Sequence, residues 1–176
     1  MNSFDDDIDD LSEDELWNLA VSPSPLTRAQ ALMALGRQAA MADNTDRALT
    51  LVDEAIEAWR QADQRREEGF AWFIRCRVLV NAERYTEGLE AIEQAGTIYA
   101  EISAPDYWQG DVAQSRAACH RGLGEWSAAV TDLLEARRLF EVSGNEHAAA
   151  HVAVEIAECT KDADVVMENL TWARDV

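Results

Sequence analysis

Two histidines and a glutamate near the C-terminal end of the chain have a spacing that could hold a metal ion. His147, His151 and Glu155 follow one another at intervals of four residues, so a helix would place all three side chains on one face. Imidazole nitrogens and carboxylate oxygens are both ligands of Zn²⁺. The metalloprotease pattern, however, requires a glutamate directly after the first histidine, and Ala148 stands there. We therefore keep a metal-dependent enzyme only as an alternative and predict no metal site.

The three cysteines do not form a recognisable site either. Cys76, Cys119 and Cys159 are far apart, and no pair has the C-x-x-C spacing of a zinc ribbon or a redox motif. We interpret them as small buried core residues. The sequence also contains no phosphate-binding glycine loop, no nucleophile elbow and no dinucleotide-binding fingerprint. We therefore predict that the protein is not an enzyme and needs no cofactor.

Composition narrows the possible partners. The 176 residues include 34 acidic and 15 basic side chains, which gives a net charge of −19. Such a surface is unsuited to the phosphate backbone, so no direct nucleic-acid binding is expected. The apolar fraction of 48% is sufficient for a packed core. No apolar run is long enough to cross a membrane, and the acidic N-terminus is unlike a signal peptide, so we expect a cytoplasmic protein without membrane contact.

The N-terminal part of the chain is an acidic arm. Residues 1–15 carry eight carboxylates and no basic side chain. Ser12 and Glu15 fit a capping box, so a short helix is predicted to follow. The segment Ser22-Pro23-Ser24-Pro25 then interrupts the chain, with Ser24 as the cap of the next helix. We therefore divide the sequence into an arm with a short helix and a proline linker, residues 1–24, and a helical repeat domain, residues 25–176.

A pattern of small and apolar residues recurs three times in the repeat domain. Each copy has a small residue, another small residue twelve positions later, and then an apolar residue and an alanine. The starting residues Gly36, Cys76 and Ala117 recur at a nearly constant interval, and a fixed period of this size, about 40 residues, indicates a solenoid of stacked helix pairs. No stretch alternates with period two, so we predict an all-α fold. The predicted pairs are 26–63, 66–102 and 106–142, with a cap pair at 146–175.

These repeats resemble those of tetratricopeptide repeat (TPR) proteins over about residues 28–145. The residues that carry the resemblance are Leu35, Gly36, Ala48, Ala55, Trp72, Tyr85, Ala95, Gly124, Trp126, Ala129 and Ala136. The resemblance implies a right-handed α-solenoid of three to four antiparallel helix pairs, with Tyr85 and Trp126 as packing residues. The period of about 40–41 residues exceeds the family's usual length of about 34. We therefore expect each second helix or linker to be longer than usual.

The resemblance also implies which face binds a partner, because first helices line the concave groove and second helices form the outer face. The first helices of the three pairs carry seven basic and four acidic residues, whereas the second helices carry five basic and fourteen acidic residues. The groove is therefore predicted to be less negative than the back. The repeat positions that map onto the groove are Met33, Arg37, Phe70, Phe73, Arg77, Gln114 and Arg121.

Other interpretations of these residues remain open. Phe70 and Phe73 are equally suited to the core, and Arg75 and Arg116, which share one repeat position, could be paired within the protein. The Lys and Asn with which some family members clamp a chaperone tail are absent, so that function is not supported. We predict a non-catalytic protein–protein interaction module, an adaptor, scaffold or assembly factor that binds a peptide or protein segment in the groove. The alternative is an acidic nucleic-acid mimic that occupies a DNA- or RNA-binding protein.

The acidic arm has three possible roles. Its residues of interest are Phe4, Asp5, Asp6, Asp7, Ile8, Asp9, Asp10 and Leu11. The apolar members are spaced as one face of a helix, with carboxylates between them, which is typical of a segment that folds on a basic and apolar surface. The arm could therefore occupy the groove of its own chain or dock onto the partner. A solubilising tail is the third interpretation.

Overall fold

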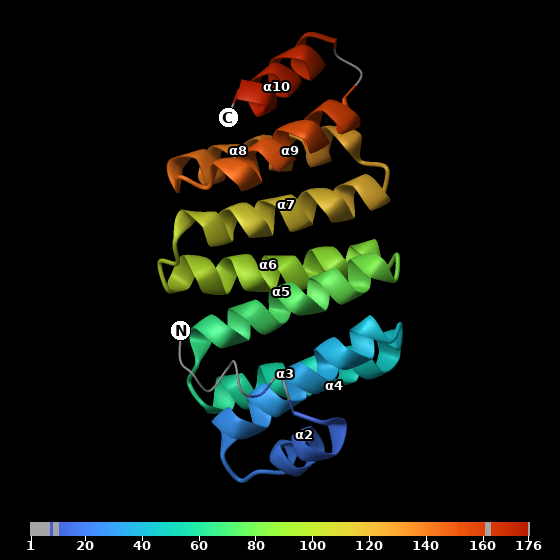
Figure 1. Cartoon of the computed structure of the whole chain (residues 1–176), viewed down its shortest axis with the longest axis vertical. Coiled ribbons are helices and arrows are strands. Elements are labelled where there is room, and N and C mark those ends of the chain that lie inside the picture. The colour runs from blue at the N-terminus through green and yellow to red at the C-terminus, as the bar shows by residue number, and fades with distance from the viewer. Residues whose placement is uncertain (1–7, 9–10, 161–162, 176) are drawn as a thin grey trace.

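The computed structural model describes Ile8, residues 11–160 and residues 163–175. Its secondary structure within these residues is helical, without a strand, and the helices stack along one long axis (Figure 1). They are α2 (Glu13–Ala20), α3 (Pro25–Met41), α4 (Thr45–Gln61), α5 (Arg65–Asn81), α6 (Tyr85–Glu101), α7 (Asp106–Gly122), α8 (Trp126–Val142), α9 (Glu146–Cys159) and α10 (Ala163–Asp175). The predicted all-α fold is confirmed, and no helix in the described residues is long and apolar enough to cross a membrane.

Local sequence signals set the first helix starts. The Ser12 hydroxyl accepts a hydrogen bond from the Glu15 amide, and the Glu15 carboxylate accepts one from the Ser12 amide at 2.9 Å. The Ser24 hydroxyl caps α3 by accepting a hydrogen bond from the Thr27 amide, and Pro25 occupies the first turn, where its missing N–H has no intrahelical partner to lose. Both predicted caps are confirmed, and they fix where α2 and α3 begin.

One turn geometry recurs along the stack. Helices α3 to α8 have 17 residues each, and three-residue turns connect them, apart from the longer segment 102–105 before α7. Each of these turns, and the turn between α8 and α9, contains one residue with left-handed backbone, at φ between 50° and 77°: Asp43, Asp63, Glu83, Ser103, Gly124 and Gly144. The amide that follows donates to a carbonyl five residues back, as from Asn44 to Ala39 at 2.9 Å. This is the Schellman arrangement, which satisfies carbonyls at the helix end.

The recurring turn accounts for the long period. Two helices of 17 residues and their two short turns together span the interval from Gly36 to Cys76. The one extra position in the segment before α7 makes the interval from Cys76 to Ala117 slightly longer. The expectation that only the second helix or the linker is lengthened is therefore wrong. Both helices of a pair have the same length, so the additional residues are shared between them.

Small residues allow the helices of a pair to cross closely. A Cβ atom added to Gly36 on α3 would lie 3.0 Å from the Val52 Cγ2 of α4, so a larger side chain there would separate the two backbones. A second register, which the sequence analysis missed, pairs a small residue with an aromatic ring. A Cβ atom at Gly69 would lie 2.6 Å from the ring of Tyr99, and one at Gly110 would lie 2.8 Å from the ring of Phe140.

The two aromatic residues at the start of second helices differ in their packing. Tyr85 of α6 lies against the end of α7, where a Cβ atom at Gly122 would be 2.4 Å from its ring. Trp126 of α8 occupies the same repeat position but is 51% exposed, so the prediction that it packs is wrong. Helix α9 ends at Cys159 and has 14 residues, whereas α7 has 17.

The buried side chains form two clusters that meet at α7. Val112 and Cys119 of α7 belong to the larger cluster, which extends back to Leu16 of α2. Ala113 and Ala117 belong to the smaller cluster, which extends forward into α9. Helix α2 thus packs on the same core as α3 and α4. One helix, α7, therefore contributes side chains to both cores.

All three cysteines are buried, which confirms that interpretation. The sulfur atoms of Cys76 on α5 and Cys119 on α7 lie 3.9 Å apart. The contact with Cys119 and burial together raise the pKa of Cys76. These thiols therefore serve as small packing groups between adjacent first helices.

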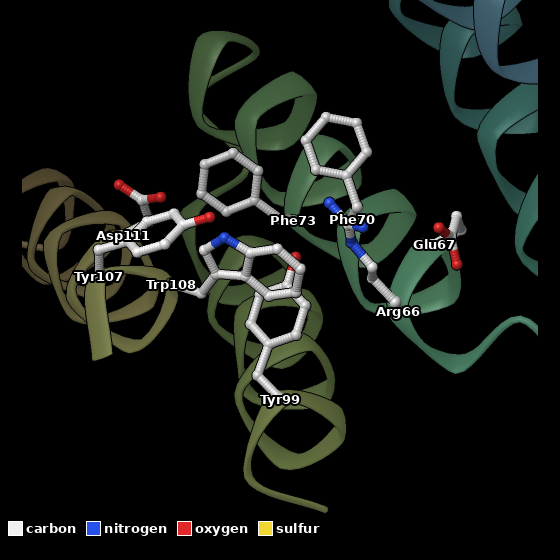
Figure 2. A pocket seen from close by; sticks show the side chains of 8 residues that line it. All are labelled: Arg66, Glu67, Phe70, Phe73, Tyr99, Tyr107, Trp108 and Asp111. Carbon is white, nitrogen blue, oxygen red and sulfur yellow. The ribbon is translucent and has the colours of Figure 1, made fainter. Parts of the chain in front are cut away.

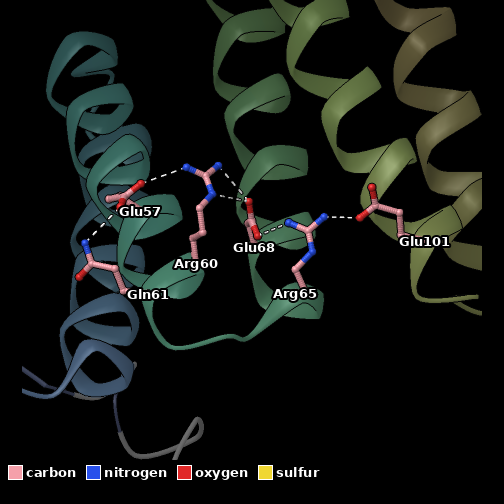
Figure 3. Close-up of polar contacts among 6 residues, drawn as sticks. All are labelled: Glu57, Arg60, Gln61, Arg65, Glu68 and Glu101. Atoms are coloured by element: carbon pink, nitrogen blue, oxygen red, sulfur yellow. Dashed lines mark hydrogen bonds and ion pairs between the residues drawn. The ribbon is translucent and has the colours of Figure 1, made fainter.

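A buried carboxylate joins the first pair to the second (Figure 3). Glu68 of α5 is 1% exposed and pairs with Arg60 of α4 at 3.0 Å and with Arg65 of its own helix at 2.5 Å. Arg60 also pairs with Glu57, and Arg65 with Glu101 of α6. The side chains of the network thus cross from α4 through α5 to α6. Both guanidinium groups are partly solvated, so the buried charge of Glu68 is matched without burying theirs.

Candidate functional site

Three adjoining hollows follow the first helices of successive pairs. The aromatic hollow, of about 350 Å³, lies between α5, α6 and α7, and the polar hollow, of about 530 Å³, lies between α5, α7 and α9. The third, of about 250 Å³, lies between α3, α4 and α5 and is called the Ile8 hollow because Ile8 lines it. Phe73 and Asp111 line the first two, and Phe70 lines the aromatic and Ile8 hollows. Together they form what we call the first-helix groove.

All seven residues predicted for the groove line one of these hollows. Met33 and Arg37 line the Ile8 hollow, Phe70 and Phe73 the aromatic hollow, and Arg77, Gln114 and Arg121 the polar hollow. Met33 is buried, so it forms the floor rather than the rim. Phe70 is an exposed aromatic residue at the junction of two hollows. The structure thus brings together on one face residues from α3, α5 and α7.

Aromatic rings from three helices converge on the aromatic hollow (Figure 2). The rings of Tyr99 and Trp108 have centroids 4.9 Å apart, and those of Phe70 and Phe73 are stacked at 6.2 Å. The Arg66 guanidinium lies over the Trp108 ring at 4.9 Å from its centroid, a cation–π contact. The walls of this hollow are therefore apolar surfaces with a positive charge held against one of them.

A carboxylate without a matching partner lies at the side of the same hollow. Asp111 of α7 lines both the aromatic and polar hollows, and it makes no hydrogen bond or ion pair with another residue that the structure describes. Burial raises the pKa of Asp111, and the nearby charge of Arg77 opposes that shift. Burial also raises the pKa of Tyr99, so this phenol stays protonated at neutral pH. The Asp111 carboxylate is thus an ionisable group in a partly desolvated part of the groove.

The polar hollow is lined by an interlinked group of side chains from α7 and α9. The Gln114 side-chain amide donates to the Glu155 carboxylate at 2.5 Å, and the His151 Nδ1 lies 2.9 Å from the same carboxylate. Arg121 approaches Glu155 at 3.6 Å. His147 does not line this hollow. Among the described residues no group of three His, Cys, Asp or Glu side chains is arranged to hold a metal ion, and Glu155 instead joins two helices.

The Ile8 hollow contains a residue of the acidic arm. Ile8 is 5% exposed and lies among Met33, Arg37, Trp59 and Phe70. Its carbonyl accepts a hydrogen bond from the Leu11 amide at 3.3 Å, and Leu11 packs against the larger core. The remaining predicted arm residues, Phe4, Asp5, Asp6, Asp7, Asp9 and Asp10, lie outside the described residues. The described part of the arm is thus in contact with the groove.

Two basic residues of the first helices do not contribute to the groove. Arg75 pairs with Asp53 of α4 at 2.7 Å, and Arg116 pairs with Asp132 of α8 at 2.7 Å and with Glu135. Internal pairing, the alternative that the sequence left open, is therefore confirmed for both. These pairs use part of the positive charge of the first helices to hold the second helices.

Sequence reasoning missed several residues of the groove, Arg66 and Glu67 of α5 among them. Tyr99, Tyr107, Trp108 and Asp111 line the aromatic hollow, but none follows the repeat pattern that was used to select candidates. Tyr99 belongs to a second helix and reaches the hollow because its ring packs beside Gly69. Trp59, Tyr99 and Phe140 follow one another at the same intervals as the starting residues of the three repeats. That spacing was the signal that could have revealed this aromatic register.

Comparison with known proteins supports the fold. No protein-family model matches the chain, and no curated protein matches it. The chain is similar to the crystal structure of a Rap protein complexed with competence and sporulation factor, with a TM-score of 0.73 and 14% sequence identity over 98% of this chain. It spans about half, 51%, of that protein. At this level of identity the similarity shows the fold alone, an all-α stack of TPR-type helix pairs.

Proposed function

We propose that the protein is a non-catalytic interaction module that binds a peptide or protein segment along the first-helix groove. The observation that carries this proposal is the continuity of the three hollows, which extend from α3 to α9 and share lining residues on α5 and α7. A groove of this form suits an extended segment, whose successive side chains can enter successive hollows. Adaptor, scaffold and assembly factor are all roles of such a module.

The chemistry of the groove favours a ligand with both apolar and acidic side chains. Phe70, Phe73 and Trp108 offer apolar surface, and aromatic residues of this kind are common anchors of protein interfaces. Arg37 and Arg77 lie beside that surface, and a guanidinium recognises a carboxylate with two parallel hydrogen bonds. The Rap protein of similar fold was crystallised in complex with a separate factor, which supports a binding role for a stack of this kind.

The nucleic-acid mimic is less consistent with the outer helices. A mimic needs carboxylates that are free to replace phosphates on a rigid surface. Asp53, Glu101, Asp132 and Glu135 of the second helices are instead paired with arginines. The remaining charge of the outer face is sufficient for solubility. We therefore favour the groove over the back as the binding surface.

The test is affinity capture with the full chain as bait, followed by measurement on the captured partner. Phe73→Ala removes an apolar wall that the aromatic and polar hollows share, and Arg77→Glu reverses a charge in the polar hollow. Arg138→Glu, on the exposed surface of α8, is the matched control. A segment of the partner should bind the two groove variants at least about tenfold more weakly, a difference of about 1.4 kcal/mol, and bind the control with parental affinity. Unchanged affinity in both groove variants, with unchanged thermal melts, would exclude the groove.

A further inference from the structure

Ile8 occupies the position that an anchor side chain of a bound segment would take. It is almost completely buried, although the residues around it in sequence are aspartates. Ile8 belongs to the larger buried cluster, and the side chains that line the hollow with it, among them Met33, Trp59 and Phe70, come from three different helices. An isoleucine in a solvated tail would gain no such contacts. The solubilising-tail interpretation therefore does not account for Ile8.

Charge complements this apolar contact. Asp7 and Asp9 flank Ile8 in the sequence, so two carboxylates accompany the side chain wherever it binds. Arg37 lines the Ile8 hollow, and Arg66 lines the adjoining aromatic hollow. Opposite charges beside an apolar anchor favour one orientation of the bound segment and oppose segments of the wrong charge.

The root of the arm is held next to the groove. Helix α2 packs on the core through Leu16, and Glu13 at its start pairs with Arg47 of α4 at 2.5 Å. The Trp17 ring lies beside the same guanidinium, 5.7 Å from its centroid. Only the short stretch from Ile8 to Ser12 separates this anchored helix from the hollow. A tether of this length gives the arm a high effective concentration, in the range of about a millimolar or more.

We propose that the acidic arm, residues 1–15, is an internal ligand of the first-helix groove, with Ile8 as its anchor, and that a partner segment of acidic and aliphatic composition must displace it. This inference rests on the proposed function, because it names the regulation and the ligand chemistry of the same groove. The arm lowers the apparent affinity of every partner by the fraction of molecules in which the groove is occupied. A partner that also binds the released arm would offset this competition.

The experiment uses a fluorescein-labelled synthetic peptide of residues 1–15 as the probe and the full-length chain as the receptor, with fluorescence anisotropy as the readout. Parental chain should bind the probe weakly, because its own arm occupies the hollow. Ile8→Asp, or Ile8→Ala if the first variant melts abnormally, should bind the probe at least tenfold more tightly. Val21→Asp, at a residue that is 79% exposed and outside the groove, is the control and should behave like the parental chain.

Two further measurements identify the binding site. Adding Arg37→Glu to Ile8→Asp should abolish the gain, and an unlabelled peptide that carries Ile8→Asp should fail to compete with the probe. Equal binding by the parental and Ile8→Asp chains would overturn the inference, as would absence of binding to either. Neither result would affect the capture experiment with Phe73→Ala and Arg77→Glu, so the internal ligand and the proposed function fail separately.

Discussion

The stack is built differently on the two sides of α7. On the N-terminal side the core contains large side chains, among them Leu35, Trp59, Leu79 and Tyr99. On the C-terminal side half of the clustered buried residues are alanines: Ala113, Ala117, Ala129, Ala136 and Ala149. The same repeat pattern therefore produces a thick core with an aromatic hollow at one end and a thinner core at the other. The two sides differ in the volume of the core side chains at positions that the repeat pattern does not specify.

The buried carboxylates of the two sides show the same difference. Glu68 is matched by two guanidinium groups from two helices. Asp132 of α8 pairs with Arg116 through one oxygen, whereas its Oδ2 accepts no hydrogen bond and lies 3.6 Å from His120. The N-terminal network joins two helix pairs, and the C-terminal one joins the two helices of a single pair. The helices on the N-terminal side of α7 should therefore unfold more cooperatively than those on the C-terminal side.

The largest effect is expected when Glu68 loses both of its partners. Arg60→Ala combined with Arg65→Ala leaves a buried carboxylate without a counter-charge, which should lower the free energy of unfolding by about 3–5 kcal/mol. Urea unfolding followed by circular dichroism measures this difference. Arg84→Ala, which removes an exposed pair with Glu87, is the control and should leave the free energy of unfolding close to the parental value, because water screens an exposed ion pair. Adding Glu68→Gln should recover part of the loss; without such recovery the buried charge is not the cause.

The next largest effect is expected for Tyr85, and it should exceed the effect of the same change at Trp126, the aromatic residue at the equivalent repeat position. Tyr85→Ala removes a ring that packs on α7 and should destabilise the chain by about 2–3 kcal/mol, less than full burial of an aromatic would imply. Trp126→Ala removes a half-exposed ring and should change the stability by less than about 1 kcal/mol. Thermal melts of the two variants side by side give the answer. Equal losses would mean that α9 covers Trp126 as α7 covers Tyr85.

The close helix crossings allow the two sides to be compared directly. Gly36→Leu on the N-terminal side and Ala129→Leu on the C-terminal side should each overpack a crossing and lower the free energy of unfolding by about 1–3 kcal/mol. Gly36 has Val52 within contact distance, and Ala129 is fully buried. Chemical denaturation of both variants, with Gly36→Ala as an intermediate step, measures the effect. Parental stability in both leucine variants would show that the repeat register is wrong.

The smallest effect is a gain of stability in Asp111→Asn. Burial raises the pKa of Asp111 in the folded chain, so the folded state holds its proton to a higher pH than the unfolded state does. Relative to the asparagine variant, Asp111 therefore contributes stability at low pH. This contribution is lost as the pH rises through the pKa that Asp111 has in the folded chain. The variant should melt higher at pH 7, and the difference should vanish in acid. A lower melting temperature at pH 7 would indicate that Asp111 has a stabilising partner.

Helices and their limits were predictable because their signals are local. The capping residues Ser12 and Ser24 and the spacing of Gly36, Cys76 and Ala117 specify where helices begin and cross. The groove was predictable in part for the same reason, since its face follows from the register of the first helices. Tyr99 was missed because the register that it shares with Trp59 and Phe140 was not among the repeat positions considered, and Asp111 was missed because its place in the groove depends on how α7 packs on α5.

The exposure of Trp126 could not be predicted from its own position. A repeat pattern indicates the contacts that a residue makes when the next repeat is complete. Helix α9, which follows Trp126, is shorter than α7 by almost one helical turn. Ile8 gives the converse example. Its sequence neighbours predict solvation, and its burial follows from a hollow formed by three distant helices.

The uniform turns between the helices have a consequence for how such a chain can change its length. Because each turn from α3 to α9 has one left-handed residue and nearly the same number of residues, a duplicated stretch of one full repeat would meet its neighbours with the same faces. Insertion of such a stretch at one of these turns would lengthen the stack by one helix pair, and new contacts would be needed only where the copy meets its neighbours. Duplication of one repeat within the gene would thus lengthen the stack in a single step.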